Sequence, residues 1–441
     1  MNLTTPEKVR KLQAALHAKA KRSPNCRFHQ LYDKVYREDI LAFAYRRCAA
    51  NGGAAGVDGQ TFTDIESYGV ARWLGELTQE LRTKTYRPQA VRRVWIPKPD
   101  GRQRPLGIPT VKDRVVQMAA VLVLDPIFEA DLPPEQFAYR HGKGAIEAVK
   151  TVRALVNRGH DKVVDADLSG YFDSIPHTEL MKSVARRVSD RHVLHLIKMW
   201  LETPIEETDE RGRRRRTTRN RDEHRGTPQG APISPLLANL YMRQFVLGWK
   251  QSGYERWFGA HIVNYADDFV ICCRGNAASA MAAMRRIMTR LRLTVNEAKT
   301  HIRHLPDESF DFLGYTIGRC HAFRTGKPYI GMRPSKTAIR RLRRRISEAM
   351  TRSKGYADVQ DRVRTLNHML IGWANYFCLG PVSRVYGAVD RHAEHRLRRW
   401  LCRKHKVPGR GTSRFPAAHI YSVLGLVRLE QRRRIVSWAP A

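Results

Sequence analysis

The sequence has 441 residues, 42% of them hydrophobic, which is enough to build the cores of two or three domains. Its 79 Lys and Arg against 42 Asp and Glu give a formal net charge of +37, an excess that a polyanion such as a nucleic acid would neutralise. No apolar stretch of about 18 residues occurs, so we expect no membrane partner, and the seven cysteines without a C-x-x-C pair exclude a zinc knuckle or disulfide framework and indicate a reducing cytoplasm.

The N-terminal part is predicted to be helical and to lead into a basic hairpin. Residues 1–45 have helical spacing, and the Gly-rich segment 51–59 is a loop. Segment 91–109 has two extended runs around Pro99-Asp100-Gly101, where proline fixes φ and glycine accepts a positive φ. A solvated surface would explain the charges of this hairpin as well as a ligand would. The charges are Arg92, Arg93, Lys98, Arg102 and Arg104.

The next elements place acids at the end of a strand. Apolar spacing predicts helices over 111–128 and 144–157. In K-V-V-D-A-D-L-S-G-Y-F-D, residues 162–173, a short β-branched run reaches Asp165 and Asp167, and Pro176 ends the segment. A helical region then extends to Trp200. Residues 207–225 are so polar that they must form an exposed loop or a long hairpin, either as a solvated arm or in contact with a phosphate backbone.

Two adjacent carboxylates form the most unusual local pattern. A Gly/Pro-rich loop leads into an apolar helix over 226–242, and N-Y-A-D-D-F-V-I-C-C, residues 264–273, then predicts a strand, a turn and a strand. Asp267 and Asp268 repel each other. A hairpin tip explains such a pair by itself, because short polar side chains cap their own backbone, so other parts of the chain must decide.

The remainder of the chain changes from a mixture of helices and strands to helices alone. Residues 276–291 have a helical pattern, 293–305 are extended around Lys299, and 310–317 alternate as a strand. Beyond Pro334, three amphipathic helices predict a separate bundle. Residues 331–441 contain 25 Lys and Arg against 6 Asp and Glu, about half of the excess charge, and the first of the three helices has arginines on its polar face.

Phosphoryl transfer by two divalent ions gives the carboxylates a reason to converge. The ions lie about 3.5–4 Å apart and are held by carboxylates from distant parts of a chain. If the strand ending at Asp167 is a neighbour of the hairpin with Asp267 and Asp268, the three acids meet, and bound Mg²⁺ cancels their repulsion. Asp165 and Asp173 are rivals of Asp167.

With its flanking blocks, from N-G-G-A-A-G-V-D-G at 51–59 to L-G-L-V-R-L at 424–429, the sequence resembles group II intron-encoded reverse transcriptases/maturases. The resemblance implies an α+β right-hand polymerase, in which fingers and palm (an antiparallel sheet plus helices) precede an all-helical thumb, also called domain X. We expect an N-terminal extension at 1–60, fingers and palm at 61–328, the thumb at 329–405 and a basic tail at 406–441. No HNH endonuclease motif follows, so we expect no second-strand cleavage.

The resemblance also implies site residues. Asp167, Asp267 and Asp268 match the catalytic aspartates, and the carbonyl of Leu168 would join them in holding two Mg²⁺, with Mn²⁺ as an alternative. Phe172 matches the residue that excludes a 2′-hydroxyl, although a core aromatic is the plain alternative. The implied nucleotide contacts are Lys98, Arg104, Gln229 and Lys299, of which Lys299 would protonate pyrophosphate or else be a solvated lysine. The implied nucleic-acid contacts are Arg140, Arg340, Arg341, Arg344 and Arg345.

The implied function is copying of intron RNA into cDNA and assistance to splicing. The partners would be the group II intron RNA, an RNA template with a DNA primer, target DNA and dNTPs, in a bacterial cytoplasm or at the nucleoid; the oligomeric state stays open. Three alternatives share these features: a maturase whose polymerase has decayed, an RNA-dependent RNA polymerase, and a reverse transcriptase recruited to defence or repair. The intact acids argue against decay, and the bulky Phe172 against an RNA polymerase.

Overall fold

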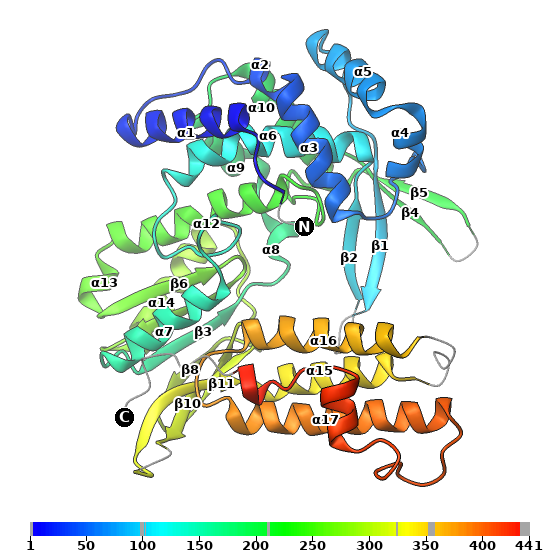
Figure 1. The fold of residues 1–441 in the computed structure, drawn as a ribbon. Helices are drawn as coiled ribbons and strands as arrows, with labels where there is room; N and C mark the ends of the chain where they lie inside the picture. The colour runs from blue at the N-terminus through cyan, green and yellow to red at the C-terminus, as the bar shows by residue number, and fades with distance from the viewer. Residues whose placement is uncertain are drawn as a thin grey trace.

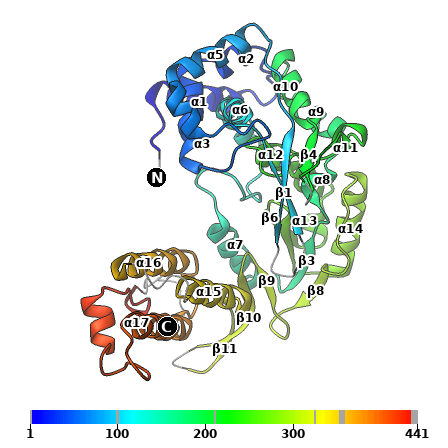
Figure 2. The ribbon, with the colours of Figure 1, turned by 90° about the vertical axis from the view of Figure 1, so that its right-hand side faces the viewer.

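The computed structural model describes residues 3–97, 101, 103–209, 212–322, 325–351 and 358–432. Figures 1 and 2 show three parts: N-terminal helices and a long hairpin at the top, a sheet covered by helices in the middle, and three long helices at the bottom. The fold is α+β, as the sequence predicts, with the helices of the last part separated from the sheets. No helix within the described ranges is both long and apolar enough to span a membrane.

The N-terminal region consists of several helices rather than the single helical stretch expected over 1–45. The first helix ends before Pro24, and the buried Arg187 side chain donates hydrogen bonds to the carbonyls of Ser23 (2.9 Å) and Cys26 (3.2 Å). The first three of these helices pack on α6 (Val111–Glu129), which is buried over most of its length, and the last two pack on each other and on the third. They are α1 (Glu7–Arg22), α2 (Tyr32–Val35), α3 (Glu38–Asn51), α4 (Phe62–Tyr68) and α5 (Val70–Arg82).

The basic hairpin is confirmed as the antiparallel pair β1 (Val91–Pro97) and β2 (Gln103–Ile108), in which Trp95 is opposite Pro105. Its turn residues 98–100 lie outside the described residues. The polar stretch 207–225 contains a second hairpin, formed by β4 (Ile205–Thr208) and β5 (Arg214–Thr217), and followed by α11 (Arg219–Asp222). Strand β4 pairs with β1, so both hairpins form one sheet in the order β2-β1-β4-β5.

The central sheet has the order β6-β7-β3-β8. Residues alternate between two apolar environments because successive strand side chains point to opposite faces. Val164 and Ala166 of β3 join the main core, whereas Val163 joins a second core with residues of α7 (Ala145–Asn157). The strands are β3 (Lys162–Asp167), β6 (Ala260–Tyr265), β7 (Asp268–Cys273) and β8 (His301–His304). The other helices of this part are α8 (Tyr171–Ser174), α9 (His177–Ala185), α10 (Arg191–Leu201), α12 (Ser234–Gln251), α13 (Tyr254–Trp257) and α14 (Ala277–Arg290).

The thumb follows a small sheet of β9 (Phe310–Phe312), β10 (Tyr315–His321) and β11 (Pro328–Pro334). Its three predicted helices are confirmed as α15 (Lys336–Ala349), α16 (Val359–Tyr376) and α17 (Ser383–Lys404). The segment expected as a tail from 406 packs on this bundle, with a π-helical turn η2 (His419–Val423) and a 3-10 turn η3 (Glu430–Arg432). Phe415, Ile420 and Leu429 are buried in the bundle core, so the described part of this segment packs as part of the three-helix bundle.

Candidate active site

Strand register brings two of the predicted carboxylates together. In the antiparallel pair of β3 and β7, Asp167 is directly opposite Asp268. Asp165 and Asp167 share the sheet face of Val163, and Asp268 shares the face of Val270, because side chains two residues apart point the same way. Both of these valines belong to the second core, on the side of α7, so the acids project from that one face of the sheet. The pairing of the two strands therefore brings Asp167 and Asp268 together, as two-metal chemistry requires.

The turn between β6 and β7 holds Asp267 beside Asp268. Ala266 has a φ of 60°, an uncommon value for a residue with a Cβ. The buried side chain of Asn264 donates a hydrogen bond to the Ala266 carbonyl at 2.8 Å, and the Asn264 carbonyl accepts one from the backbone of Phe137 at 2.9 Å. The asparagine of N-Y-A-D-D therefore fixes the tight turn. The Asp pair thus lies at a hairpin tip and also belongs to the acidic site.

Crowding of the acids changes their protonation. The pKa of Asp268 is raised to about 7, mainly by burial and then by the charges of Asp267, Asp165 and Asp167, against a lowering effect of Lys299. Burial also raises the pKa of Asp165 to about 6, against the lowering effects of Arg303 and His301. These acids are half-buried, and carboxylates crowded in this way are stabilised by a bound divalent cation.

Two side chains from a distant segment bind Asp167. Its Oδ2 accepts hydrogen bonds from Lys299 Nζ at 2.9 Å and from Asn296 Nδ2 at 3.1 Å, and its carbonyl accepts one from the Asn296 backbone at 2.8 Å. The extended segment predicted over 293–305 is a strand only at β8. The residues before it form a turn that returns Asn296 and Lys299 to β3, which places Lys299 at the site and adds Asn296, a residue that the sequence reasoning missed.

The acids fit a divalent metal in their chemistry. Carboxylate oxygens gathered on one sheet face are the ligands that Mg²⁺ and Mn²⁺ prefer. Among the described residues, no three His, Cys, Asp or Glu side chains stand ready to hold an ion as they are placed, and Asp167 Oδ2 is engaged by Lys299 and Asn296. The residues that would hold a metal are thus assembled, with Lys299 as the counter-charge of one of them.

Replacing Asp268 with Asn should stabilise the metal-free protein, because it removes a charge that burial and three neighbouring acids disfavour. The pKa of this carboxyl is raised in the folded state, so its cost begins above the unfolded pKa near 4, grows up to about pH 7 and is constant beyond. We expect a gain on the order of 2 kcal/mol at pH 8 and almost none at pH 4. Thermal unfolding in EDTA at both values measures it; equal gains would contradict this explanation.

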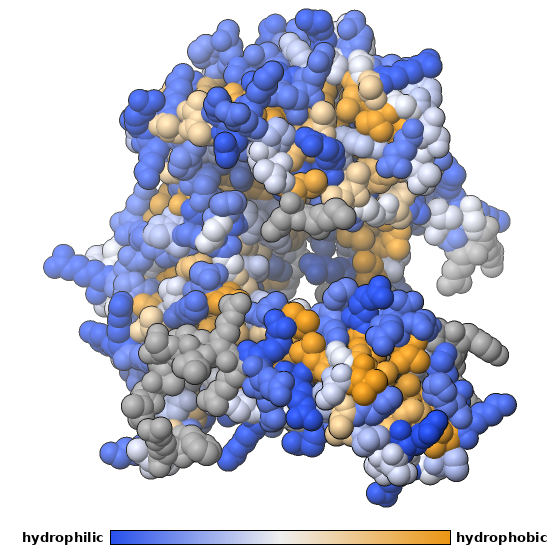
Figure 3. Space-filling view, viewed as in Figure 1, coloured by the Kyte–Doolittle hydropathy of each residue, from blue (hydrophilic) through white to orange (hydrophobic). Residues whose placement is uncertain are grey.

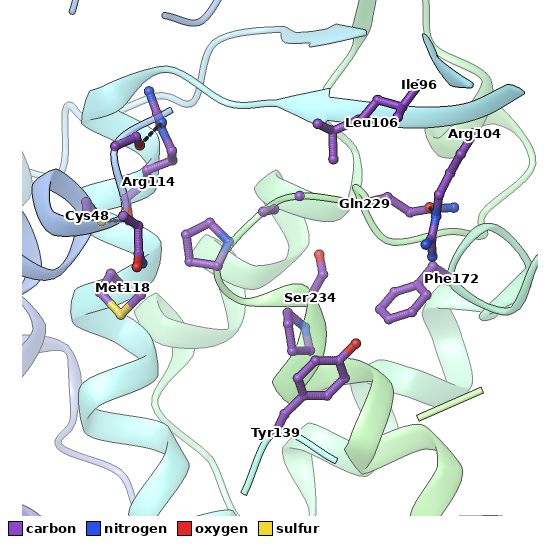
Figure 4. Close-up of a pocket in the computed structure, with 16 residues that line it drawn as sticks. Cys48, Ile96, Arg104, Leu106, Arg114, Met118, Tyr139, Phe172, Gln229 and Ser234 are labelled. Atoms are coloured by element: carbon purple, nitrogen blue, oxygen red, sulfur yellow. Dashed lines mark hydrogen bonds between the residues drawn. The ribbon is translucent and has the colours of Figure 1, made fainter. Parts of the chain in front are cut away.

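A cavity of about 620 Å³ lies between the β1–β2 hairpin and the loop before α12. None of the acids lines it, but Tyr139, which does, has its pKa raised by burial and by the charge of Asp267, so the cavity lies within electrostatic reach of the acids. Figure 4 shows Arg104 extending from β2 toward Gln229 and Phe172, with Tyr139 on the opposite side. The Phe172 side chain is 8% exposed and its ring packs edge-on against Tyr171 at 5.7 Å between centroids. Three of the predicted nucleotide contacts, Arg104, Phe172 and Gln229, therefore line one cavity, and Lys98 lies outside the described residues.

Two glycines allow the hairpin and the loop to touch. The Gly107 backbone donates a hydrogen bond to the Gln229 carbonyl at 2.6 Å. A Cβ on Gly230 would lie 2.3 Å from the Gly107 carbonyl oxygen, and Gly230 has a φ of 108°. Only glycine can adopt this φ and also leave room for the Gly107 carbonyl. The close approach of the two backbones therefore explains the glycine of the P-Q-G sequence at 228–230.

Arg140 has a different role from the predicted one. Its guanidinium forms two hydrogen bonds with the Glu129 carboxylate, from Nη2 at 2.6 Å and from Nε at 2.9 Å, and donates to the carbonyls of Pro133 and Gln136. The side chain is only 6% exposed. Arg140 therefore ties the loop after α6 to the helix, and we do not count it among the nucleic-acid contacts.

Arg140→Met is accordingly expected to destabilise the fold by about 3 kcal/mol, because it leaves Glu129 without its partner in a partly buried position. Chemical denaturation of Arg140→Met and of the double variant Arg140→Met/Glu129→Gln measures the effect. The double variant should recover part of the loss, since it removes the unpaired charge. A normal unfolding free energy together with weakened RNA binding would restore the original prediction.

The thumb arginines border a second cavity of about 420 Å³. Arg341 and Arg345 line it together with Trp373 and Tyr376. Burial raises the pKa of the Tyr376 hydroxyl to about 12, and the charges of Tyr265 and Asp268 contribute, so this cavity lies near the acids. Figure 3 shows the face of the molecule hollowed between the upper helices and the thumb. The predicted thumb residues Arg340, Arg341, Arg344 and Arg345 are all exposed.

Comparison with known proteins agrees with these features. Residues 96–317 match the family described as reverse transcriptase (RNA-dependent DNA polymerase), and residues 339–415 match the group II intron maturase-specific domain. The chain is 31% identical over 349 residues to Protein YkfC of Escherichia coli, covering 70% of this chain and 88% of that protein.

It is also 31% identical over 229 residues to the group II intron-encoded protein LtrA of Lactococcus lactis, covering 51% of this chain and 36% of LtrA. The first of the two family matches contains the central sheet with its acids, and the second contains the helical bundle. The chain therefore belongs to the family of group II intron-encoded reverse transcriptases/maturases.

Proposed function

We propose that the protein is an RNA-directed DNA polymerase encoded by a group II intron, which copies the intron RNA into cDNA. The observation that carries the proposal is the register of β3 and β7, which sets Asp167 opposite Asp268 on one sheet face. A cavity lined by Arg104, Gln229 and Tyr139 supports it, because Tyr139 lies within electrostatic reach of Asp267. A polymerase site needs these two parts side by side: acids for metal ions and cationic or amide groups for a nucleotide.

Asp167, Asp267 and Asp268, with the Leu168 carbonyl, would hold two Mg²⁺ or Mn²⁺ ions, which supply activation of the primer 3′-hydroxyl and neutralise the phosphates. Arg104 offers a guanidinium to the triphosphate and Gln229 an amide to the nucleotide. Phe172 limits the space beside the sugar. Lys299, paired with Asp167 at 2.9 Å, would donate a proton to the leaving pyrophosphate, and a metal held by that carboxylate would compete with this pairing.

The second part of the proposal is binding of intron RNA by the thumb to assist splicing and mobility. The match to the maturase-specific domain and the exposed arginines of α15 support it. Guanidinium groups bind phosphates without reading sequence, which suits a large folded RNA. A maturase with little polymerase activity, or a related reverse transcriptase in defence or repair, would share this surface.

Copying of a heteropolymeric RNA tests the polymerase part. A purified sample with a DNA primer annealed to RNA, Mg²⁺ and four dNTPs should yield a full-length product that ribonuclease A does not degrade and whose sequence is complementary to the template. Omission of one dNTP should stop extension at the first position that needs it. A protein that binds the same primer and template but never extends would contradict the proposal and favour the maturase without polymerase activity.

The double variant Arg341→Gln/Arg345→Gln tests the thumb. We expect affinity for structured RNA to fall about tenfold near 0.15 M salt, and the slope of log K against log salt to decrease by about 1.5 units, because two phosphate contacts are lost. Arg286→Gln/Arg290→Gln is the matched control, since these two exposed arginines lie on α14, on the other side of the central sheet from the thumb. Equal losses in both variants would show a nonspecific charge effect.

A further inference from the structure

A chain of hydrogen bonds extends from the β1–β2 hairpin to another acid, Asp173. Arg104 Nε donates to Gln229 Oε1 at 3.2 Å, and Gln229 Nε2 donates to Asp173 Oδ2 at 2.9 Å. Asp173 belongs to α8 and immediately follows Phe172. We call these residues the Arg104–Gln229–Asp173 chain. From the sequence, Asp173 is only a rival of Asp167.

The two ends of the chain fix the orientation of the Gln229 amide. A carboxylate only accepts hydrogen bonds, and a guanidinium only donates them. The amide must therefore turn Nε2 toward Asp173 and Oε1 toward Arg104, because the reverse orientation would lose both hydrogen bonds. Without Asp173, the amide is free to rotate, and either of its ends can face the cavity.

The backbone ties the same segments together. Thr227 N–H donates to the Phe172 carbonyl at 2.7 Å, and Gly226 N–H donates to the Ile175 carbonyl at 2.8 Å. On the other side, the Gln229 carbonyl accepts from Gly107. Gln229 thus joins the strand that carries Arg104 to the segment that carries Phe172, and its side chain is the part of this junction that faces the cavity.

The charge of Asp173 makes its position informative. An exposed carboxylate next to Arg104 and Gln229 repels the triphosphate that these two residues are proposed to bind. Asp173 also lines a cavity of about 230 Å³ with Arg93, Arg219 and Arg225, whose charges favour a carboxylate there but do not require it to contact Gln229. The hydrogen bond to Gln229 supplies a reason for a carboxylate, since an acceptor without donors is what holds the amide in a single orientation.

We propose that Asp173 is a positioning residue for the incoming nucleotide, which acts by orienting Gln229 and, through it, Arg104. The inference rests on the proposed polymerase function and deepens it. Asp173 touches neither the metals nor the reacting atoms in this role. It prepares the side chains that the nucleotide meets, so its loss should affect nucleotide binding more than the chemical step.

Steady-state extension with dTTP on an RNA template tests the inference. For Asp173→Ala we expect the KM for dTTP to rise about fivefold, the effect of one lost hydrogen bond, while kcat falls less than twofold. Asp173→Asn, whose amide oxygen still accepts from Gln229, should lie between Asp173→Ala and the wild type. In a Gln229→Ala background, Asp173→Ala should have no further effect on KM, because the group that it orients is absent.

Asp222→Ala is the matched control. It removes the same charge from the neighbouring exposed segment, where Asp222 accepts a hydrogen bond from Thr218 and has no contact with Gln229. A purely electrostatic role of Asp173 predicts the opposite sign, a lower KM in Asp173→Ala, because a repulsive charge is lost. A purely structural role predicts fewer active molecules with an unchanged KM. Either result would overturn the inference while the polymerase function stands.

Binding separates failure of the inference from failure of the proposed function. Fluorescence anisotropy of a dye-labelled dTTP with the protein–primer–template complex, in Ca²⁺ to prevent turnover, measures affinity without catalysis. If the wild type fails to extend a primer but binds this probe about fivefold more tightly than Asp173→Ala, the inference stands and the polymerase function falls. If the wild type neither extends nor binds, both are overturned.

Discussion

Asp167→Asn and Asp268→Asn should each lower the rate of dTTP incorporation about 10³-fold at saturating nucleotide, the largest effects that we expect from single substitutions. Asn has the shape of Asp but no charge, so it preserves packing and replaces an anionic metal ligand with a much weaker neutral one. The two positions are cross-strand neighbours in the register of β3 and β7, so we expect the two substitutions to have similar effects on the rate. Single-turnover extension with enzyme in excess over primer–template gives the rate.

Asp165→Asn is the matched control for this experiment. Asp165 lies two residues earlier on the same strand and the same face, and like Asp167 it is half-buried. It is not part of the proposed metal site, so we expect less than about a tenfold loss. Equal losses in Asp165→Asn and Asp167→Asn would show that the wrong acid of β3 was assigned. Unchanged RNA affinity in all three variants would confirm that the fold is intact.

Phe172→Val should raise the efficiency of UTP relative to dTTP by about 10²-fold. The ring lines the cavity beside Gln229 and Arg104, so a smaller side chain opens space for a 2′-hydroxyl, and steric exclusion of a single group is worth a few kcal/mol. The ratio of kcat/KM for UTP and dTTP on one template measures the effect. Phe172→Tyr keeps the ring and should leave the ratio near that of the wild type.

The plain alternative for Phe172 is a core aromatic, since the ring also packs against Tyr171. That role predicts lower stability in Phe172→Val with the same preference for dTTP. Discrimination that persists in Phe172→Val would therefore contradict the assignment of the sugar-excluding residue. The assignments of the other site residues would not be affected by this result.

Local patterns predicted the elements of the site but not how they meet. The β-branched run before Asp167 and the apolar runs around Asp267 and Asp268 each specify a strand, and the structure confirms them as β3, β6 and β7. The register of β3 with β7 joins residues about 100 positions apart. Neither strand determines it alone, because it depends on which faces both strands bury.

Residues whose partners are distant in sequence were the ones missed. Asn296 and Asp173 are polar residues in irregular or short segments, and each acquires its role from a hydrogen bond to a side chain more than 50 positions away. The signal for Asn296 was its place three residues before Lys299, which a turn converts into a shared contact with Asp167. Arg140 was misjudged for the opposite reason, since its partners are carbonyls and a glutamate close in sequence.

The most direct test of the polymerase site is primer extension on poly(rA)/oligo(dT) with Mg²⁺, comparing dTTP with UTP for the wild type and for the double variant Asp267→Ala/Asp268→Ala. We predict extension by the wild type with dTTP and not with UTP, and no extension by the double variant. Efficient extension with UTP would contradict a DNA polymerase. Extension that survives in the double variant, or a folded wild type that binds the primer–template and never extends it, would contradict the site itself.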